Sequence, residues 1–403
     1  MSSNNIRLTR IIYGLMILVT FCLSLILNLP LTSVLKAVEL SPGVPPASEI
    51  RGVWLTNVDS EVLFSTQGVK QAVDRLNQLN FNTLYPTVWQ GGYTLYPSAV
   101  AEAVVGRGLD PTPGLQGRDM LEEVIETGHD QGMTVIPWFE FGFQAPADSD
   151  LASRHPEWLT KRLDETQTKL EGVHERVWLN PFHPEVQQFL LDLVSEVVEN
   201  YDVDGIQMDD HFGLPSEFGY DPYTIELFKA EHDGREPPPE FYDTYWVRWR
   251  ADKINDFMER LFYTVKEIKS DCIVSLSPNP LHFSLPAYLQ DWFTWERKGW
   301  IEEIILQDYR TDMDQFISEM ERTEVELART HIPVAIGILS GLRNNPTPTG
   351  TIQRQVAEVR QRQFAGVSFF FYESLWNWAE DTPEQREVQV KKLFPEPVMR
   401  PRV

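Results

Sequence analysis

At residues 203–212 the chain reads Val203-Asp204-Gly205-Ile206-Gln207-Met208-Asp209-Asp210-His211-Phe212, an apolar run that ends abruptly in two carboxylates and a histidine. A parallel strand in an α/β protein is buried on both faces and therefore reads as a nearly continuous apolar run. The charged residues stand at the C-terminal end of this predicted strand, where such folds keep their active sites. The stretch thus predicts a parallel sheet and also the edge of that sheet where function lies.

Runs of the same kind recur along the chain and alternate with helix-like segments. Strands are predicted at eight places, at residues 50–58, 81–89, 134–141, 204–209, 273–277, 301–307, 332–339 and 367–372. Apolar residues at helical spacing predict helices between and after them, at residues 69–79, 119–131, 184–200, 241–269, 352–364 and 383–393. This alternation predicts an α/β fold, a (β/α)8 TIM barrel over residues 49–395. The alternative is an open doubly wound sheet, but no glycine-rich phosphate loop follows the first strand.

The N-terminus has the pattern of an export segment. Arg7 and Arg10 precede an uncharged apolar stretch at residues 11–29. A cleaved signal has an apolar region of about 7–15 residues, whereas a spanning helix needs about 20, so both readings stay open. Residues 1–30 are therefore predicted to be an apolar helix that acts as a signal peptide or membrane anchor, and residues 31–48 a linker. Since the arginine side stays cytoplasmic, the barrel is expected at the cell envelope, on its periplasmic or extracellular face, or secreted.

Composition excludes some function classes. The chain of 403 residues carries 35 basic and 59 acidic residues, a net charge of −24. Nucleic-acid binding rests on basic side chains that neutralise phosphates, so nucleic acid is not an expected partner. A single cysteine, Cys272, lies in the predicted barrel, and no Cys/His cluster of the metal-binding kind is present in the sequence. We therefore expect neither a metal nor an organic cofactor.

Polar and aromatic residues gather at the predicted strand ends, which meet at the C-terminal mouth of a barrel. The residues expected to line this cleft and bind substrate are Trp54, Trp89, Trp138, Asp210, His211, Asn279, Gln307, Asp308, Tyr309 and Trp376. Aromatic faces can pack against pyranose rings, and the polar groups can bond sugar hydroxyls. The pattern therefore favours a carbohydrate as the substrate.

Three carboxylates are candidates for the chemistry: Asp209, Glu140 and Glu373. Glycoside hydrolysis needs one carboxyl group as acid and another as nucleophile or base, and the acid needs a raised pKa. Structural roles stay open. Asp209 and Asp210 would point to opposite sides of a regular strand, so one of them can serve a loop alone. Glu140 can instead pair with a loop arginine, and Glu373 with Arg51 or Arg310.

Five segments, in this order, resemble the bacterial Glycosyl hydrolase-like 10 family. They are Glu49-Ile50-Arg51-Gly52-Val53-Trp54-Leu55-Thr56, Phe81-Asn82-Thr83-Leu84-Tyr85-Pro86 with Val88-Trp89, the run from Tyr201 to Phe212, Ser275-Leu276-Ser277-Pro278, and Gly366-Val367-Ser368-Phe369-Phe370 with Tyr372-Glu373-Ser374-Leu375. The resemblance covers residues 48–375. It implies a (β/α)8 domain of envelope or secreted proteins linked to cleavage of glycan strands, including peptidoglycan stripped of its peptides. Similarity to barrel glycosidases implies that Asp209 is the nucleophile or base.

Three functional hypotheses follow. The leading one is a glycoside hydrolase that acts on a cell-envelope or extracellular polysaccharide, with Asp209 as nucleophile or base and Glu140 or Glu373 as acid. The second is a non-catalytic glycan-binding barrel of the envelope, since a fold does not dictate an activity. The third is a metal-dependent polysaccharide deacetylase or hydrolase, with His211, Asp209 and His282 as ligands.

Overall fold

The structure is a computed structural model that describes residues 47–378 and 381–402. The predicted segment at residues 1–30, and the predicted linker except for its last two residues, lie outside the described residues. Among the residues that are described, no helix is both long and apolar enough to cross a membrane.

Eight parallel strands form a closed ring at the centre of the described unit. They are β1 (Ile50–Leu55), β2 (Thr83–Pro86), a third strand in two pieces, β5 (Thr134–Val135) and β6 (Trp138–Phe139), then β10 (Gly205–Asp209), β11 (Ile273–Ser277), β12 (Glu303–Gln307), β13 (Val334–Leu339) and β16 (Gly366–Phe370). The hydrogen-bonded order is β5-β2-β1-β16-β13-β12-β11-β10-β6. The third strand is interrupted at Pro137, which has no N–H to donate to the ladder. Since its two pieces pair with β2 and β10, the ring closes, and the predicted (β/α)8 barrel is confirmed.

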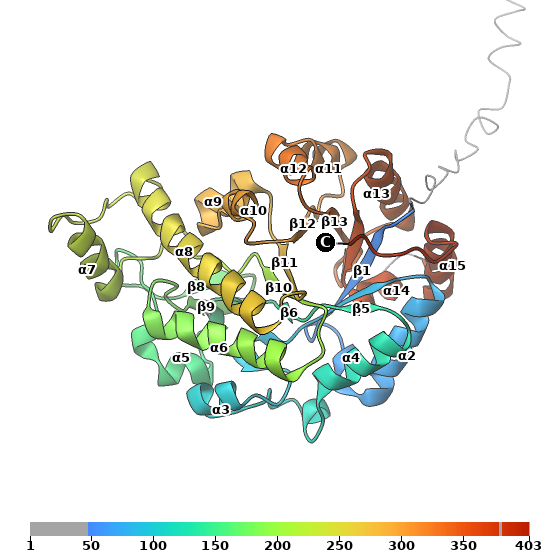
Figure 1. Ribbon diagram of the computed structural model, residues 1–403, viewed down its shortest axis with the longest axis horizontal. Coiled ribbons are helices and arrows are strands. Elements are labelled where there is room, and N and C mark those ends of the chain that lie inside the picture. Colours follow the sequence, from blue (N-terminus) through green and yellow to red (C-terminus); the bar gives the residue numbers. More distant parts are fainter. Residues whose placement is uncertain (1–46, 379–380, 403) are drawn as a thin grey trace, which may run out of the picture. The chain divides into compact units, whose positions relative to one another are not determined.

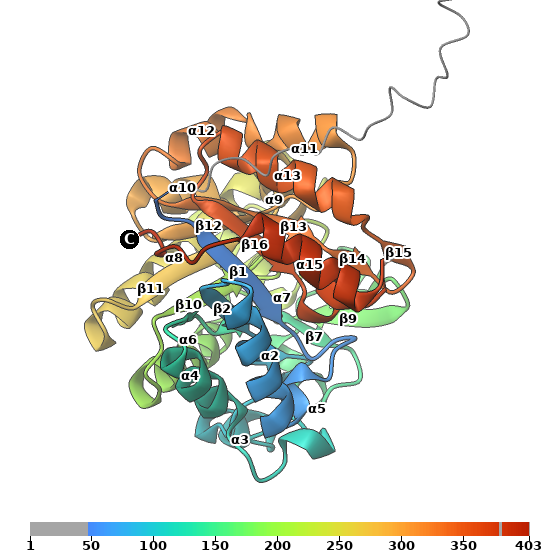
Figure 2. The same ribbon diagram turned by 90° about the vertical axis from the view of Figure 1, so that its right-hand side faces the viewer.

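Helices surround this ring (Figure 1). The connections carry α2 (Thr66–Gln78), α3 (Ala99–Val105), α4 (Met120–Asp130), α5 (Asp150–Arg154), α6 (Pro184–Asn200), α7 (Pro222–Glu231), α8 (Thr244–Ile268), α9 (Leu281–Tyr288), α10 (Trp292–Lys298), α11 (Met313–Met320), α12 (Thr323–Ala328), α13 (Thr349–Gln361), α14 (Tyr372–Trp376) and α15 (Pro383–Leu393). Figure 2 shows α13, α15 and α2 in succession over the last and first strands. Side chains cap several helices, as where Ser65 accepts from the Gly68 N–H at the start of α2.

Three small antiparallel sheets are built into the loops of the barrel mouth. They are β3 (Trp89–Gln90) with β4 (Tyr93–Thr94), β14 (Gly341–Leu342) with β15 (Asn345–Pro346), and a sheet of β7 (Gln144–Pro146), β9 (His174–Trp178) and β8 (Lys169–Glu171). No strand is predicted from the sequence between residues 141 and 204, where the β7–β9–β8 sheet lies. Short 3-10 turns occur at Val62–Phe64, Pro113–Leu115 and Pro156–Trp158.

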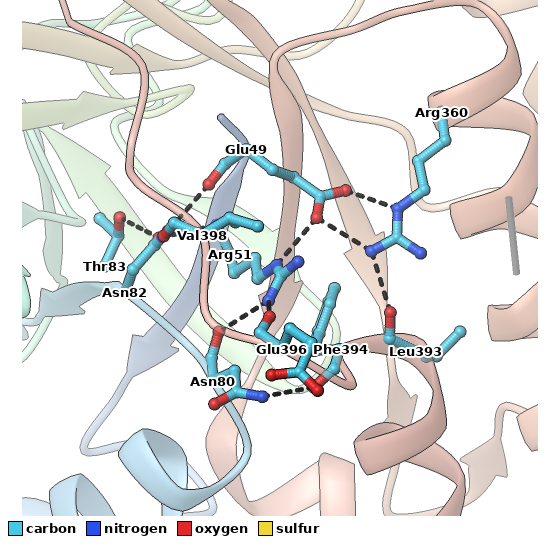
Figure 3. A network of polar contacts seen from close by, with 10 residues as sticks. All are labelled: Glu49, Arg51, Asn80, Asn82, Thr83, Arg360, Leu393, Phe394, Glu396 and Val398. Atoms are coloured by element: carbon cyan, nitrogen blue, oxygen red, sulfur yellow. Dashed lines mark hydrogen bonds and ion pairs between the residues drawn. The ribbon is translucent and has the colours of Figure 1, made fainter. Parts of the chain in front are cut away.

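The opposite, N-terminal end of the barrel is held by a buried ion triad (Figure 3). The fully buried carboxylate of Glu49 accepts from Arg51 Nε at 2.8 Å and from Arg360 Nε at 2.7 Å. The C-terminal segment joins this network, because Arg51 Nη1 also donates to the Glu396 carbonyl at 2.7 Å. The triad thus ties the first strand to α13 and to the end of the chain.

Replacing Glu49 with Gln is expected to lower the free energy of unfolding by about 3–5 kcal/mol, because two guanidinium groups would be left without their buried counter-charge. Urea denaturation followed by circular dichroism measures the change. The matched control is Glu387→Gln, since Glu387 pairs with Arg75 at 2.8 Å but is half exposed. This control should cost at most about 1 kcal/mol. Equal costs for the two variants would contradict the role of the triad.

Candidate active site

Asp209 ends strand β10 and is held there by its neighbours in the barrel. The residue is 3% exposed, and Oδ1 accepts a hydrogen bond from Gln307 Nε2 at 2.6 Å. The same Gln307 nitrogen donates to the Ser277 carbonyl at 2.9 Å, so β10, β11 and β12 together fix this contact. The backbone carbonyl of Asp209 accepts from Gln290 Nε2 at 2.8 Å. The carboxylate is therefore buried in a rigid polar setting at the C-terminal mouth.

Asp210 and His211 complete a charged cluster beside Asp209. His211 Nδ1 lies 3.2 Å from Asp210 Oδ1 and 3.5 Å from Asp209 Oδ2. Strand β10 ends at Asp209, so strand alternation no longer separates the two carboxylates and both reach one imidazole. The other oxygen of Asp210 accepts from Asn279 Nδ2 at 2.6 Å. The cluster thus brings together Asp209, Asp210, His211, Asn279 and Gln307, all predicted at the mouth.

The charges in this cluster shift the pKa values of His211 and Asp209. Burial lowers the pKa of His211, but the carboxylates around it outweigh that effect and raise the pKa to about 10. Burial and the charge of Asp210 raise the pKa of Asp209 well above its usual range, and the contact with His211 opposes them. His211 is accordingly an imidazolium at neutral pH, and groups this close titrate together.

Glu140 follows the third strand and belongs to the same site. Burial raises its pKa to about 7, and the Asp210 charge adds to this while His211 opposes it. Its one side-chain hydrogen bond among the described residues is a long one from Thr87 Oγ1, at 3.5 Å. The positive charge of Arg176 acts on Glu140, yet the two form no ion pair within the described structure, so the predicted salt bridge to a loop arginine is not made. Glu140 is therefore a carboxyl group that readily carries a proton near neutral pH.

Tyr309 also lies among these charges. Its ring stacks on Phe370 with 5.3 Å between ring centres. Burial raises the pKa of its hydroxyl, and the charges of Asp209, Asp210 and Glu140 raise it further. The phenol therefore stays protonated and can donate a hydrogen bond into the site.

Glu373 is placed elsewhere. It stands in the first turn of α14, and its Oε2 accepts from Ser60 Oγ at 2.8 Å. Burial raises its pKa, and the acidic neighbour that acts on it is Glu61 rather than a member of the cluster. It does not pair with Arg51 either, which binds Glu49. Of the two predicted acids, Glu140 is the one whose charge acts on Asp209.

Asp308 was predicted to bind substrate, and the structure contradicts this. The residue is fully buried, and neither carboxylate oxygen has a hydrogen-bond partner among the described residues. Strand β12 ends at Gln307, and the charges that act on Asp308 are those of Glu319 and Arg310 rather than those of the cluster. Burial raises its pKa to about 8, with Glu319 of α11 as the acidic neighbour. Asp308 therefore follows β12 in the buried region near α11, away from the charged cluster.

The predicted tryptophan platforms are also corrected, because a ring that stacks on a sugar needs an exposed face. Each of the four is at most 2% exposed: Trp54, Trp89, Trp138 and Trp376. Trp54 donates from Nε1 to Gln207 Oε1 at 2.8 Å inside the barrel. Trp376 lies outside the ring of strands, under the guanidinium of Arg75. The aromatic rings that do lie among the site charges are the half-buried Tyr309 and Tyr288.

Two functional candidates escaped the sequence prediction, and both lie on the β7–β9–β8 sheet. Glu171 Oε2 stands 4.0 Å from His211 Nε2 and accepts from Gln144 Nε2 at 2.7 Å. Arg176 lies with its guanidinium carbon 5.0 Å from the centre of the Phe141 ring. The available signal was the alternation His174, Arg176, Trp178 after Gly172, which is typical of a strand following a turn.

The metal hypothesis loses one of its ligands. His282 lies on α9 and pairs with Glu319 at 3.7 Å, outside the cluster. Asp209, Asp210 and His211 do offer ligand atoms within 4.8 Å of one another. A histidine ligates a metal only as the neutral ring, so metal binding here would have to release the proton that the surrounding carboxylates favour on His211. The three residues therefore offer a proton-transfer site, and a metal site only with loss of that proton.

A closed (β/α)8 barrel with a carboxylate pair at its C-terminal mouth has the architecture of the barrel glycosidases. The model of the Glycosyl hydrolase-like 10 family matches residues 49–357, and the chain belongs to this family. The resemblance seen in the sequence is thereby confirmed.

Relatives and solved structures agree with this assignment. The chain is 26% identical over 252 residues to glycosyl hydrolase DigH of Escherichia coli K12, which covers 58% of this chain and 52% of that protein. It is 24% identical over 259 residues to glycosyl hydrolase YngK of Bacillus subtilis, covering 57% and 45%. The chain thus spans about half the length of the curated relatives it matches.

Among solved structures, the glycoside hydrolase domain of PgaB (BpsB) from Bordetella bronchiseptica has the same fold. It superposes with a TM-score of 0.61 at 14% identity, covering 81% of this chain and 94% of that one. The catalytic domain of β-amylase from Paenibacillus polymyxa gives a TM-score of 0.57 at 10% identity, covering 87% and 98%. Family and fold together support a hydrolase that acts on glycans.

Proposed function

We propose that the protein is a glycoside hydrolase that cleaves a cell-envelope or extracellular polysaccharide by carboxylate chemistry. The observation that carries the proposal is the pair Asp209 and Glu140, two carboxyl groups at one barrel mouth, with the charge of Glu140 acting on Asp209. Glycosidases need such a pair, one group protonated and one ionised.

The contacts divide the roles between the two groups. Asp209 receives the Gln307 N–H at Oδ1 and faces the His211 imidazolium at Oδ2, and both contacts favour the carboxylate form. Glu140 has only the long contact from Thr87, and its pKa is raised to about 7. Burial and the charge of Asp210 raise the pKa of Asp209 too, so the assignment rests on its contacts with Gln307 and His211. On that basis Asp209 is the nucleophile or base and Glu140 the acid that protonates the leaving oxygen. Asn279 and Tyr309 are placed to bond sugar hydroxyls or to hold the charged cluster in position.

The proposal extends to substrate and location. Peptidoglycan strands stripped of their peptides are the proposed polysaccharide, since members of the family are linked to glycan-strand cleavage. We place the barrel at the cell envelope or outside it, with residues 1–30 as its export signal or anchor. A non-catalytic glycan-binding barrel is the second candidate, favoured by the deep burial of Asp209, which is only 3% exposed.

Incubation of the purified protein with peptide-free peptidoglycan strands tests the proposal, with mass spectrometry to follow the products. Shorter glycan fragments are the expected result. Proton NMR of the first anomer released then shows whether the configuration is retained or inverted. Binding of the strands without any cleavage would support the second candidate instead.

A further inference from the structure

A hollow of about 580 Å³ lies in the loops of the barrel mouth, beside the β7–β9–β8 sheet. This volume is within the range of small-ligand sites, about 300–1,000 Å³. Its lining comes from the loops after the first and second strands and from the β7–β9–β8 sheet with its connections, and it includes Val58, Gln90, Asp148, Val173, Glu175 and Arg176. The hollow therefore mixes exposed apolar groups with hydrogen-bonding ones, as a sugar site does.

Arg176 is the residue that connects this hollow with the acid cluster. It lies on the central strand β9, opposite Lys169 of β8 and Pro146 of β7. Residues directly opposite in antiparallel strands share a face, as do residues two apart, so Lys169, Glu171 and Arg176 line one side of the sheet. The charges of Glu171 and Glu140 both act on Arg176. Arg176 thus lines the hollow and is also close enough to the proposed acid Glu140 for their charges to interact.

The guanidinium of Arg176 has no counter-charge in contact with it. Among residues 47–378 and 381–402 it makes no ion pair, and its buried Nε has no hydrogen-bond partner. Its neighbours Arg162 and Lys169, in contrast, both pair with Glu217 at 3.2 Å. The Phe141 ring holds the Arg176 guanidinium plane in place without using its N–H groups. Arg176 is therefore a preorganised donor with free bonding capacity.

We propose that Arg176 and this hollow form a subsite for a sugar unit that carries a carboxylate, next to the scissile bond. A planar guanidinium matches a carboxylate with two parallel N–H···O bonds, which a neutral hydroxyl cannot accept in the same way. The carboxylates of Asp148 and Glu175 are exposed and therefore screened, so they weaken the attraction only partly. The amide of Gln90, fixed by Asn57 Nδ2 at 3.1 Å, supplies a neutral contact for the same sugar.

The inference rests on the proposed function and narrows its substrate to acidic glycans. A peptidoglycan strand without peptides carries one free carboxylate on every second sugar. Attached peptides would convert that carboxylate into an amide and remove the charge. The subsite would therefore distinguish stripped strands from strands that still carry peptides.

Steady-state kinetics with two matched substrates test the subsite: stripped strands with free carboxylates, and the same strands after chemical reduction of the carboxylates to alcohols. Arg176→Gln is expected to raise KM by about 10- to 100-fold for the acidic strands and less than about 2-fold for the reduced ones. Arg162→Gln, which removes a nearby arginine, should change neither value. An equal loss on both substrates would show that Arg176 acts only through Glu140, and that result overturns the proposal.

Calorimetry separates this proposal from the proposed function. An Asp209→Asn protein, which is expected to bind without cleaving, is titrated with acidic and with reduced oligosaccharides, each with and without Arg176→Gln. Tighter binding of the acidic form that disappears in the double variant supports the subsite, even if the native protein cleaves neither glycan. Equal binding of both forms, or binding of neither, overturns it.

Discussion

Replacing Asp209 with Asn is expected to lower kcat on the glycan substrate by about 10³-fold or more, the scale of losing an essential nucleophile or base. The two side chains have the same shape, and the Asn oxygen can still accept from Gln307. The variant should therefore fold normally while lacking the negative charge that faces His211. Initial rates of product formation measure the loss, and the unfolding temperature verifies the fold.

The matched control is Asp202→Asn, the same substitution just before the other end of strand β10. Asp202 is exposed and pairs with Lys269 at 2.9 Å. It precedes the N-terminal end of β10, whereas the barrel mouth lies at the C-terminal end of that strand. Its rate should stay within about 2-fold of the native value, since exposed ion pairs contribute little. Full activity of Asp209→Asn on a confirmed substrate would remove Asp209 from the mechanism and leave the glycan-binding alternative or another carboxylate.

The barrel could be predicted because its strands are buried along most of their length and their sequences are largely apolar. The predicted strands at residues 273–277 and 204–209 match β11 and β10 to within one residue. The predicted strand at residues 50–58 is longer than β1, which ends at Leu55. The sequence pattern includes loop residues such as Val58 that follow the end of the hydrogen-bonded ladder. Polar and charged residues stand out against such runs, so Asp209, Asp210 and Gln307 could be located as well.

The direction of each side chain could not be predicted from strand ends alone. Asp308 follows Gln307 directly, yet Gln307 bonds Asp209 in the cluster while the acidic neighbour of Asp308 is Glu319 on α11. Tryptophan occurs both in protein cores and in binding clefts, so the sequence alone does not indicate that Trp54 fills the barrel interior. Glu171 and Arg176 reach the site from a sheet inserted in a long loop, and such contacts between distant segments leave no periodic pattern in the sequence.

Activity is expected to fall as the pH rises through about 7. Glu140 acts as an acid only while protonated, and its pKa is raised to about 7 by burial. The protonated form therefore dominates below that pH and decreases about tenfold per pH unit well above it. The alkaline limb of kcat/KM reports this group in the free enzyme.

Replacing Glu140 with Gln is expected to lower kcat on the glycan by about 10²- to 10⁴-fold, the usual contribution of a general acid. The alkaline limb near pH 7 should disappear from what activity remains, because Gln does not titrate. An aryl glycoside with an acidic phenol as leaving group needs no proton, so any hydrolysis of such a substrate should be affected much less. These two signatures separate a lost acid from a damaged fold.

Glu165→Gln is the matched control for Glu140→Gln, since Glu165 lies in the same connection between barrel strands, is 73% exposed and pairs with Lys161. It should keep both the native rate and the native pH profile. If Glu140→Gln retained the alkaline limb, the titrating group would be another carboxyl, and Asp209 would be the next candidate because its pKa is raised as well. In that case the two groups would exchange roles, with the more deeply buried Asp209 carrying the proton and Glu140 acting as the base. Asp209→Asn would then spare substrates with good leaving groups, so the two substitutions, each measured on glycan and on aryl glycoside, assign acid and base.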